Sequence, residues 1–230
     1  MCSVSIVEGC SRGIAYSILD ILCLQNSVSS YCDEAVKLKN QLKVQKGSDT
    51  TETTKSHKQS NGKRSKTLIM TTSMARDIKH DEFNKNYTGG DAVFNRHHGG
   101  VVETVSKAME KKMEKMKPDI VVIQAGGNDL QRSISPLALA NEIVGAGKLA
   151  VRLGATVAVC SILPRASFHL NLKRWETNIL LRGLCQSNNL TFIDNKEIVV
   201  GKHLLKDGVH LNTAGTQILS SNIIKCLDEL

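Results

Sequence analysis

The run DIVVIQA at residues 119–125 leads directly into the glycine-rich loop GGND at residues 126–129. The run is almost continuously apolar and rich in β-branched side chains, which is typical of a strand buried on both faces of a sheet. In parallel sheets of this kind, ligands bind at the edge formed by the carboxyl ends of the strands. The loop at 126–129 is therefore a candidate functional region.

Three further runs of the same kind flank this stretch: TLIMT at 67–71, TVAVCSI at 156–162 and LTFID at 190–194. Longer stretches with helical periodicity alternate with them. We expect helices at 102–116, from Ser135 and Pro136 to Gly154, at 169–186, and from Thr213 to the last residue. This alternation predicts a three-layer α/β domain, with a parallel sheet covered by helices on both faces.

The composition indicates a soluble protein with a sizeable core. The chain has 230 residues, of which 41% are apolar, enough for one α/β domain with an appendage. A membrane helix needs roughly 18 uninterrupted apolar residues, and Asp20 interrupts the apolar run at 14–24. We therefore expect neither a membrane span nor a signal peptide.

The cysteines are odd in number, scattered, and never arranged as a CxxC pair. This pattern favours neither a disulfide framework nor a zinc site. A reducing compartment fits it best, so we expect the protein in the cytoplasm. The seven cysteines are Cys2, Cys10, Cys23, Cys32, Cys160, Cys185 and Cys226.

The amino-terminal segment, residues 1–45, has the pattern of a helix with a coiled-coil seam at residues 17–42. Such a seam makes self-association a candidate function of this segment. The alternative is a helix of the same length that packs on its own domain. The seam residues, at alternating spacings of four and three, are Ser17, Ile21, Leu24, Val28, Tyr31, Ala35, Leu38 and Leu42.

Residues 46–65 form a basic segment with almost no apolar side chains, so we expect a flexible linker before a globular domain at 66–230. Residues 46–66 contain six Lys and Arg residues but only two acidic residues, Asp49 and Glu52. The net charge of the whole chain is +8. A segment of this charge attracts nucleic acid or an anionic membrane surface. A solvated linker without a partner is the alternative.

Four loops hold the polar and glycine residues from which a site can be built. Serine-based acyl transfer needs a hydroxyl, an imidazole base, a carboxylate that orients the base, and donors for the oxyanion. Taken alone, the serine would be a helix cap and the histidine a structural residue. The loops contain Ser73 in TTSMARD at 71–77, Gly99 in HHGG at 97–100, Asn128 in GGND at 126–129, and Asp207 and His210 in DGVHLN at 207–212.

In order and spacing, these four blocks resemble those of the SGNH (GDSL-like) hydrolase superfamily. The resemblance implies that Ser73 is the nucleophile, His210 the general base and then acid, and Asp207 the residue that orients His210. It also implies an oxyanion hole formed by the N–H groups of Ser73 and Gly99 and the side chain of Asn128. The implied fold is flavodoxin-like, with about five parallel strands, and the implied substrate is a small ester or O-acetyl compound. The superfamily uses no metal and no organic cofactor.

Within the superfamily, five stretches look most similar to invertebrate esterase-like domains related to the esterase domains of LINE-type retrotransposons. These are TTSMARDI at 71–78, GGND at 126–129, SILPR at 161–165, FIDN at 192–195 and DGVHLN at 207–212. This resemblance leaves an alternative function open: a catalytically weak or inactive SGNH-fold interaction protein that self-associates and binds RNA.

The first block departs from the family, which usually has Gly-Asp before the serine, where this chain has Thr71 and Thr72. A β-branched residue restricts the backbone of a tight turn, and loss of the aspartate removes a hydrogen-bond acceptor. We therefore expect the two threonines to weaken the site.

Two other polar features lie near the blocks. The adjacent His97 and His98 belong at the rim of the cleft, because neighbouring histidines rarely face the same way and no carboxylate cluster accompanies them. Arg165, after Leu163 and Pro164, is either a ligand for an acidic substrate group or a solvated loop residue.

Overall fold

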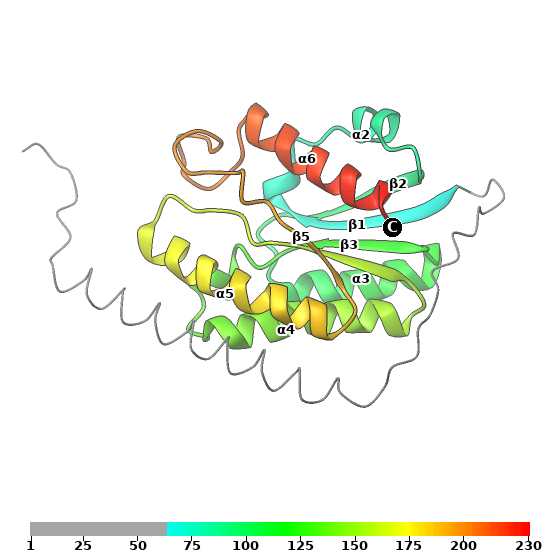
Figure 1. The fold of residues 1–230 in the computed structure, drawn as a ribbon, viewed down its shortest axis with the longest axis horizontal. Coiled ribbons are helices and arrows are strands. Elements are labelled where there is room, and N and C mark those ends of the chain that lie inside the picture. Colours follow the sequence, from blue (N-terminus) through cyan, green and yellow to red (C-terminus); the bar gives the residue numbers. More distant parts are fainter. Residues whose placement is uncertain (1–63) are drawn as a thin grey trace, which may run out of the picture. The chain divides into compact units, whose positions relative to one another are not determined.

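The computed structural model describes residues 64–230, and these form a parallel five-stranded sheet in the order β2-β1-β3-β4-β5 (Figure 1). The coiled-coil prediction for residues 17–42 and the linker prediction up to residue 63 lie outside the described residues. The strands are β1 (Ser65–Thr72), β2 (Gly90–His97), β3 (Ile120–Gln124), β4 (Thr156–Cys160) and β5 (Thr191–Ile193).

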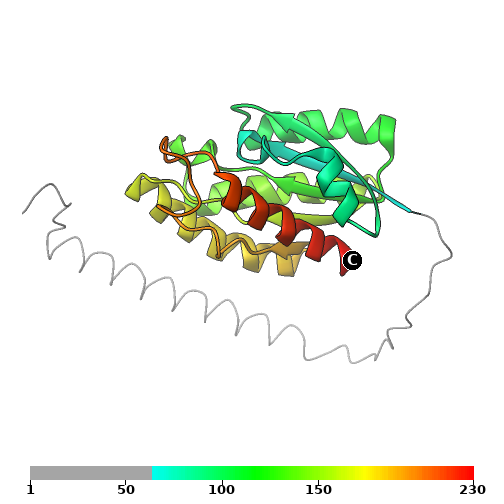
Figure 2. The same ribbon diagram turned by 90° about the horizontal axis from the view of Figure 1, so that it is seen from above.

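Helices cover both faces of the sheet, as expected for a three-layer α/β fold. On one face lie α2 and α6; on the other lie α3, α4 and α5 (Figure 1), and Figure 2 views the α6 face from above. The helices are α2 (His80–Asn86), α3 (Val102–Met116), α4 (Pro136–Arg152), α5 (Phe168–Ser187) and α6 (Thr213–Asp228), with short 3-10 turns η2 (Ser73–Ala75) and η3 (Asp129–Gln131).

Alternate side chains of the central strands enter two separate apolar cores. In β1, Leu68 and Met70 pack with α3, α4 and α5, whereas Ile69 packs with α2 and α6, and all three side chains are fully buried. This explains why the strand is apolar at three consecutive positions, 68–70, rather than at every second one. Within residues 64–230, no helix is both long and apolar enough to cross a membrane.

The residue pattern by itself does not reveal β2 or the short helix α2. β2 is an edge strand that pairs only with β1, and most of its side chains are only partly buried. Its sequence, GDAVFNRH, is therefore mixed rather than apolar. The predicted start of α4 is confirmed, because the Ser135 hydroxyl caps the helix by accepting the Ala138 N–H at 3.1 Å.

Candidate active site

Ser73 is the first residue after β1, which lies in the interior of the sheet between β2 and β3. The chain leaves the strand in an extended conformation at Thr72 and turns at once into η2, where the Arg76 N–H donates to the Ser73 carbonyl at 3.2 Å. This turn sets the partly buried serine at the carboxyl edge of the sheet, where parallel α/β folds place their sites.

Asp207 and His210 lie in the loop between β5 and α6 and are bonded to each other. The Asp207 Oδ2 atom lies 2.8 Å from His210 Nδ1, and Oδ1 accepts the N–H groups of Val209 and His210 at 2.9 Å each. The hydrogen bond with the His210 ring, followed by the two backbone bonds, holds the pKa of Asp207 well below its ordinary value. Asp207 is therefore a carboxylate at neutral pH.

The ring of His210 joins this loop to the serine, 137 residues away in the sequence. The His210 Nε2 atom lies 3.2 Å from the Ser73 hydroxyl oxygen, while Nδ1 faces Asp207. A carboxylate only accepts, so a neutral His210 carries its proton on Nδ1 and leaves Nε2 free to accept from Ser73. The side chains of Asp207, His210 and Ser73 thus form one continuous hydrogen-bonded chain.

Two of the three expected oxyanion donors, Gly99 and Asn128, are linked through one turn. Gly99 lies in the turn after β2 with a positive φ of 69°, and within residues 64–230 no atom beyond Gly99 and its chain neighbours lies within 4 Å of the position that a Cβ would take. The Asn128 side-chain amide donates to the Gly100 carbonyl at 2.9 Å, which ties it to this turn. The amide has two hydrogens, so this bond leaves the second for another acceptor.

Arg165 is buried at the centre of these loops, so the interpretation as a solvated residue is wrong. It is 5% exposed, and its guanidinium donates to the Val209 carbonyl at 3.1 Å and to the Met74 sulfur at 3.0 Å. It also contacts Asn128 Oδ1 at 3.5 Å. Burial lowers the pKa of Arg165, an effect opposed by the charge of Asp207. Arg165 thus connects the serine turn, the asparagine loop and the histidine loop.

Two polar residues of the site region have structural roles that the sequence does not reveal. Asp129 is fully buried, accepts the Val102 N–H at the start of α3, and forms an ion pair with Arg132 at 2.8 Å. Gln124, 1% exposed, accepts both the N–H and the hydroxyl of Thr72 at 3.3 Å. The available signal for Gln124 is a single polar residue at the end of the apolar run at 119–125.

The expectation that Thr71 and Thr72 restrict a tight turn is wrong. Both belong to β1, where Thr71 pairs with Arg96 of β2 and with Gln124 of β3. Extended backbone suits β-branched residues, and Thr72 has φ −99° and ψ −169°. The turn begins only after the threonines, and Gln124 supplies an acceptor for Thr72.

His97 and His98 lie at the end of β2, next to the turn that holds Gly99. His97 is partly buried and its Nε2 has no hydrogen-bond partner among the described residues, whereas His98 is exposed. Within residues 64–230, no group of three His, Cys, Asp or Glu side chains is placed to hold a metal ion. Their assignment to a cleft rim stays a prediction.

The sheet order, the covering helices and the serine turn after the first strand define an SGNH-like three-layer α/β fold. Residues 67–218 match the GDSL-like lipase/acylhydrolase family, and the chain belongs to this family. A search of curated proteins finds no match to the sequence.

Solved structures with the same fold come from several bacteria. A GDSL-like lipase from Bacteroides thetaiotaomicron is 21% identical with a TM-score of 0.63, covering 72% of this chain and 88% of its own. A lipase/acylhydrolase from Enterococcus faecalis is 20% identical with a TM-score of 0.60, covering 72% and 96%. The relation to retrotransposon esterase domains, self-association and nucleic-acid binding stay predictions.

Proposed function

We propose that the protein is a serine esterase that hydrolyses a small ester or O-acetyl substrate, with Ser73, His210 and Asp207 as its catalytic triad. The position of the His210 ring carries this proposal, because its two nitrogens lie 3.2 Å from Ser73 Oγ and 2.8 Å from Asp207 Oδ2. Membership of the GDSL-like lipase/acylhydrolase family supports the same chemistry.

In the first half of the proposed reaction, His210 Nε2 takes the Ser73 proton while Ser73 Oγ attacks the carbonyl carbon of the ester. The tetrahedral intermediate collapses with cleavage of the carbon–oxygen bond to the alcohol. Protonated His210 gives its proton to the departing alcohol, and the acyl group remains on Ser73. Asp207 stabilises the imidazolium of His210 and holds its Nδ1 atom toward the Asp207 carboxylate.

In the second half, water replaces the alcohol. His210 takes a proton from the water as its oxygen attacks the acyl carbon, and the second tetrahedral intermediate releases the carboxylic acid and restores the Ser73 hydroxyl. The reaction consumes one water and needs no oxidant or reductant.

The proposed oxyanion donors are the Ser73 N–H, the Gly99 N–H and the second amide hydrogen of Asn128. The Asn128 bond to the Gly100 carbonyl supports this assignment, because it fixes the amide beside the turn that holds Gly99. Preorganised donors of this kind stabilise the negative charge that develops on the carbonyl oxygen. Arg165, in contact with Asn128 Oδ1, acts as a positioning residue for the amide.

A fluorophosphonate probe tests the proposal directly, since it phosphonylates an activated serine. The purified protein should become labelled at Ser73, located by mass spectrometry of its peptides, and His210→Ala should slow the labelling strongly. Ser221, an exposed serine of α6, provides the matched control, and Ser221→Ala should label like the parent. Absence of labelling in the parent, or labelling that survives Ser73→Ala, would contradict the proposal.

A further inference from the structure

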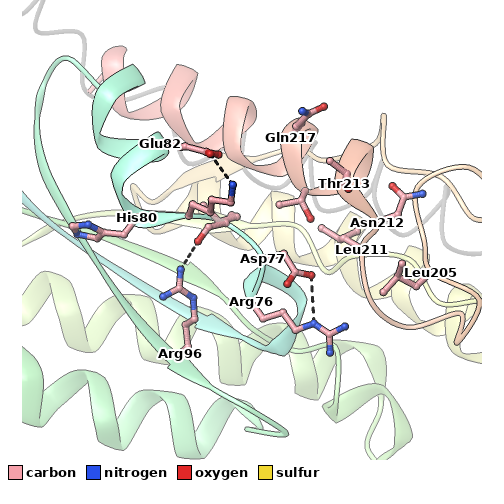
Figure 3. Close-up of a pocket in the computed structure, with 13 residues that line it drawn as sticks. Arg76, Asp77, His80, Glu82, Arg96, Leu205, Leu211, Asn212, Thr213 and Gln217 are labelled. Carbon is pink, nitrogen blue, oxygen red and sulfur yellow. Dashed lines mark hydrogen bonds and ion pairs between the residues drawn. The ribbon is translucent and has the colours of Figure 1, made fainter.

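Two parts of the domain surface differ in the kind of side chain that they expose. A pocket of about 830 Å³ lies between the segment 76–82 and the beginning of α6 (Figure 3). Its charged side chains bond to one another: Arg76 pairs with Asp77 at 3.4 Å, and Lys79 pairs with Glu82 at 2.9 Å. The outer face of α5, in contrast, exposes large apolar side chains to water.

Helix α5 carries apolar side chains on two opposite faces. One face enters a core of the domain, where Leu181 and Cys185 are fully buried and Leu170 packs beside them. A second set, which we call the outer stripe, lies on the side of the helix opposite Leu181, because an α-helix completes a turn in 3.6 residues. The outer stripe consists of Phe168, Leu172, Trp175 and Ile179.

The outer stripe is in contact with water along its length. Phe168 and Trp175 are each 39% exposed and Ile179 is 42% exposed, whereas Leu172 is partly buried. Helix α4 lies between α3 and α5, so α5 is at the end of its layer and packs mainly against α4, β5 and η3 (Figure 1). The outer stripe faces away from all of these contacts.

Helix α3, in the same layer, shows how a helix with a free outer face is built. Each of its exposed residues is polar or charged, as in an ordinary surface helix. A helix that is apolar on two opposite faces is instead typical of one that packs on both sides. The exposed residues of α3 are Glu103, Thr104, Lys107, Glu110, Lys111, Glu114 and Lys115.

The spacing of the outer stripe identifies the partner. Its residues are separated by four, three and four positions, the spacing with which two helices pack side by side. The same spacings occur in either chain direction. An antiparallel copy of α5, related by a two-fold axis between Leu172 and Trp175, therefore brings these two residues together and also brings Phe168 against Ile179. A contact of this kind uses the same surface on both copies, as two-fold dimers do.

We propose that the outer stripe of α5 is the contact surface for a second copy of this chain, packed antiparallel. The proposal is independent of the esterase function. Aromatic residues such as Phe168 and Trp175 are enriched in the cores of protein interfaces. The stripe covers only about 17 Å of helix, so the contact is small. We expect a weak dimer, half formed at concentrations on the order of 10–100 µM.

Sedimentation velocity of the full-length protein over a series of concentrations tests the contact. Ile179→Lys should raise the dissociation constant at least roughly tenfold, because an ammonium group would be buried against Phe168 of the other copy. Val151→Lys is the matched control: Val151 lies on α4 and is 45% exposed, and its replacement should leave association unchanged. A parent that stays monomeric, or association unaffected by Ile179→Lys, overturns the proposal.

A further variant separates this contact from the seam predicted at residues 17–42. Leu24→Lys places a charge in that seam and should leave the dimer through α5 intact. If Leu24→Lys abolishes association and Ile179→Lys does not, the chain associates elsewhere and the proposal is wrong. The thermal unfolding midpoints of the variants, measured at low concentration, should equal that of the parent.

Mixing two variants tests the antiparallel arrangement. Phe168→Lys and Ile179→Glu should each weaken association on their own, because each sets a charge against an apolar side chain. In a mixture, the new ammonium of one variant meets the new carboxylate of the other, while the opposite end of the stripe keeps its native pair. With one variant carrying a fluorophore at its amino-terminus, the mixed dimer should form about tenfold more tightly than either variant alone. A mixture that associates no more tightly than its components refutes the proposed pairing.

Discussion

The molecule holds Ser73 and His210 in two different ways. Ser73 follows two buried threonines, Thr71 and Thr72, at the end of an interior strand, and Gln124 of the neighbouring strand bonds to Thr72. His210 lies in a surface loop whose Asp207 side chain is 46% exposed. The serine is held by the sheet, whereas the histidine is held by hydrogen bonds within four residues and by Arg165.

This difference separates activity from stability. A change in the loop at 207–210 removes local bonds at the surface, so it should reduce hydrolysis without unfolding the domain. A change beneath the serine turn reaches the buried sheet, so it should lower the free energy of unfolding.

The largest effect is expected at the reacting atoms themselves. Ser73→Ala and His210→Ala should each reduce kcat/KM for a short-chain p-nitrophenyl ester by about 10⁴-fold or more. The double variant should be no worse than either single variant, because a triad acts as a unit. Steady-state kinetics of the three variants measures this, and additive losses would mean that the two residues act separately.

Asp207→Asn should separate activity from stability most clearly. The amide of asparagine cannot stabilise the imidazolium as a carboxylate does and favours the wrong tautomer of His210, so kcat should fall by about 10³- to 10⁴-fold. The thermal unfolding midpoint should change little, because the side chain is half exposed. A large drop in this midpoint would show that the loop supports the fold as well as the chemistry.

Asp129 should behave in the opposite way, since it lies beneath the site and touches none of the reacting groups. Asp129→Ala removes the acceptor for the Val102 N–H and leaves Arg132 without one of its partners. The free energy of unfolding should fall by about 3 kcal/mol, measured by urea denaturation. Asp91→Ala, at an exposed ion pair, is the control and should change it by less than about 0.5 kcal/mol.

The two threonines before Ser73 should respond with opposite signs to the same substitution. The buried Thr71 hydroxyl has no hydrogen-bond partner in the domain at 64–230, so Thr71→Val should stabilise the domain by about 1 kcal/mol. The Thr72 hydroxyl donates to Gln124, so Thr72→Val should destabilise it by about 1 kcal/mol. Urea denaturation of both variants checks the sign, and a loss of stability in Thr71→Val would point to a hydrogen bond of that hydroxyl.

The smallest expected effect is the loss of stability from Asp207 at low pH. The hydrogen bonds of Asp207 hold its pKa in the folded state below the ordinary value of 3.8, so the unfolded chain binds the proton more tightly. The stabilisation is therefore present above about pH 4 and is lost as the pH falls below this value. The slight difference in unfolding midpoint between the parent and Asp207→Asn should shrink between pH 7 and pH 3. A difference that grows toward low pH would contradict this assignment.

The sequence predicts those parts of the fold that a buried pattern marks. β1, β3, β4 and β5 each have an apolar run, and the Ser135 cap marks the start of α4. β2 lacks such a run because five of its eight side chains are only partly buried, and partly buried side chains need not be apolar. Its presence followed only from the family resemblance.

In the candidate site too, some residues can be predicted from the sequence and others cannot. Asp207 and His210 are close in sequence, and their local bonds can be expected from a spacing of three residues. The roles of Arg165 and Gln124 depend on which loops and strands meet, and spacing along the chain does not encode this. The backbone at Thr71 was mispredicted because the family motif does not tell where the strand ends and the turn begins.

The sheet order also determines when the candidate active site can assemble during synthesis of the chain. The ribosome makes β1 first, yet this strand lies between β2 and β3 and cannot complete its pairing until both have emerged. Asp207 and His210 emerge near the end, followed by α6, whose Leu219 and Ile223 close one of the apolar cores. A nascent chain therefore carries Ser73 without its hydrogen-bond partner His210, and we expect the proposed hydrolysis to begin only once α6 has left the ribosome.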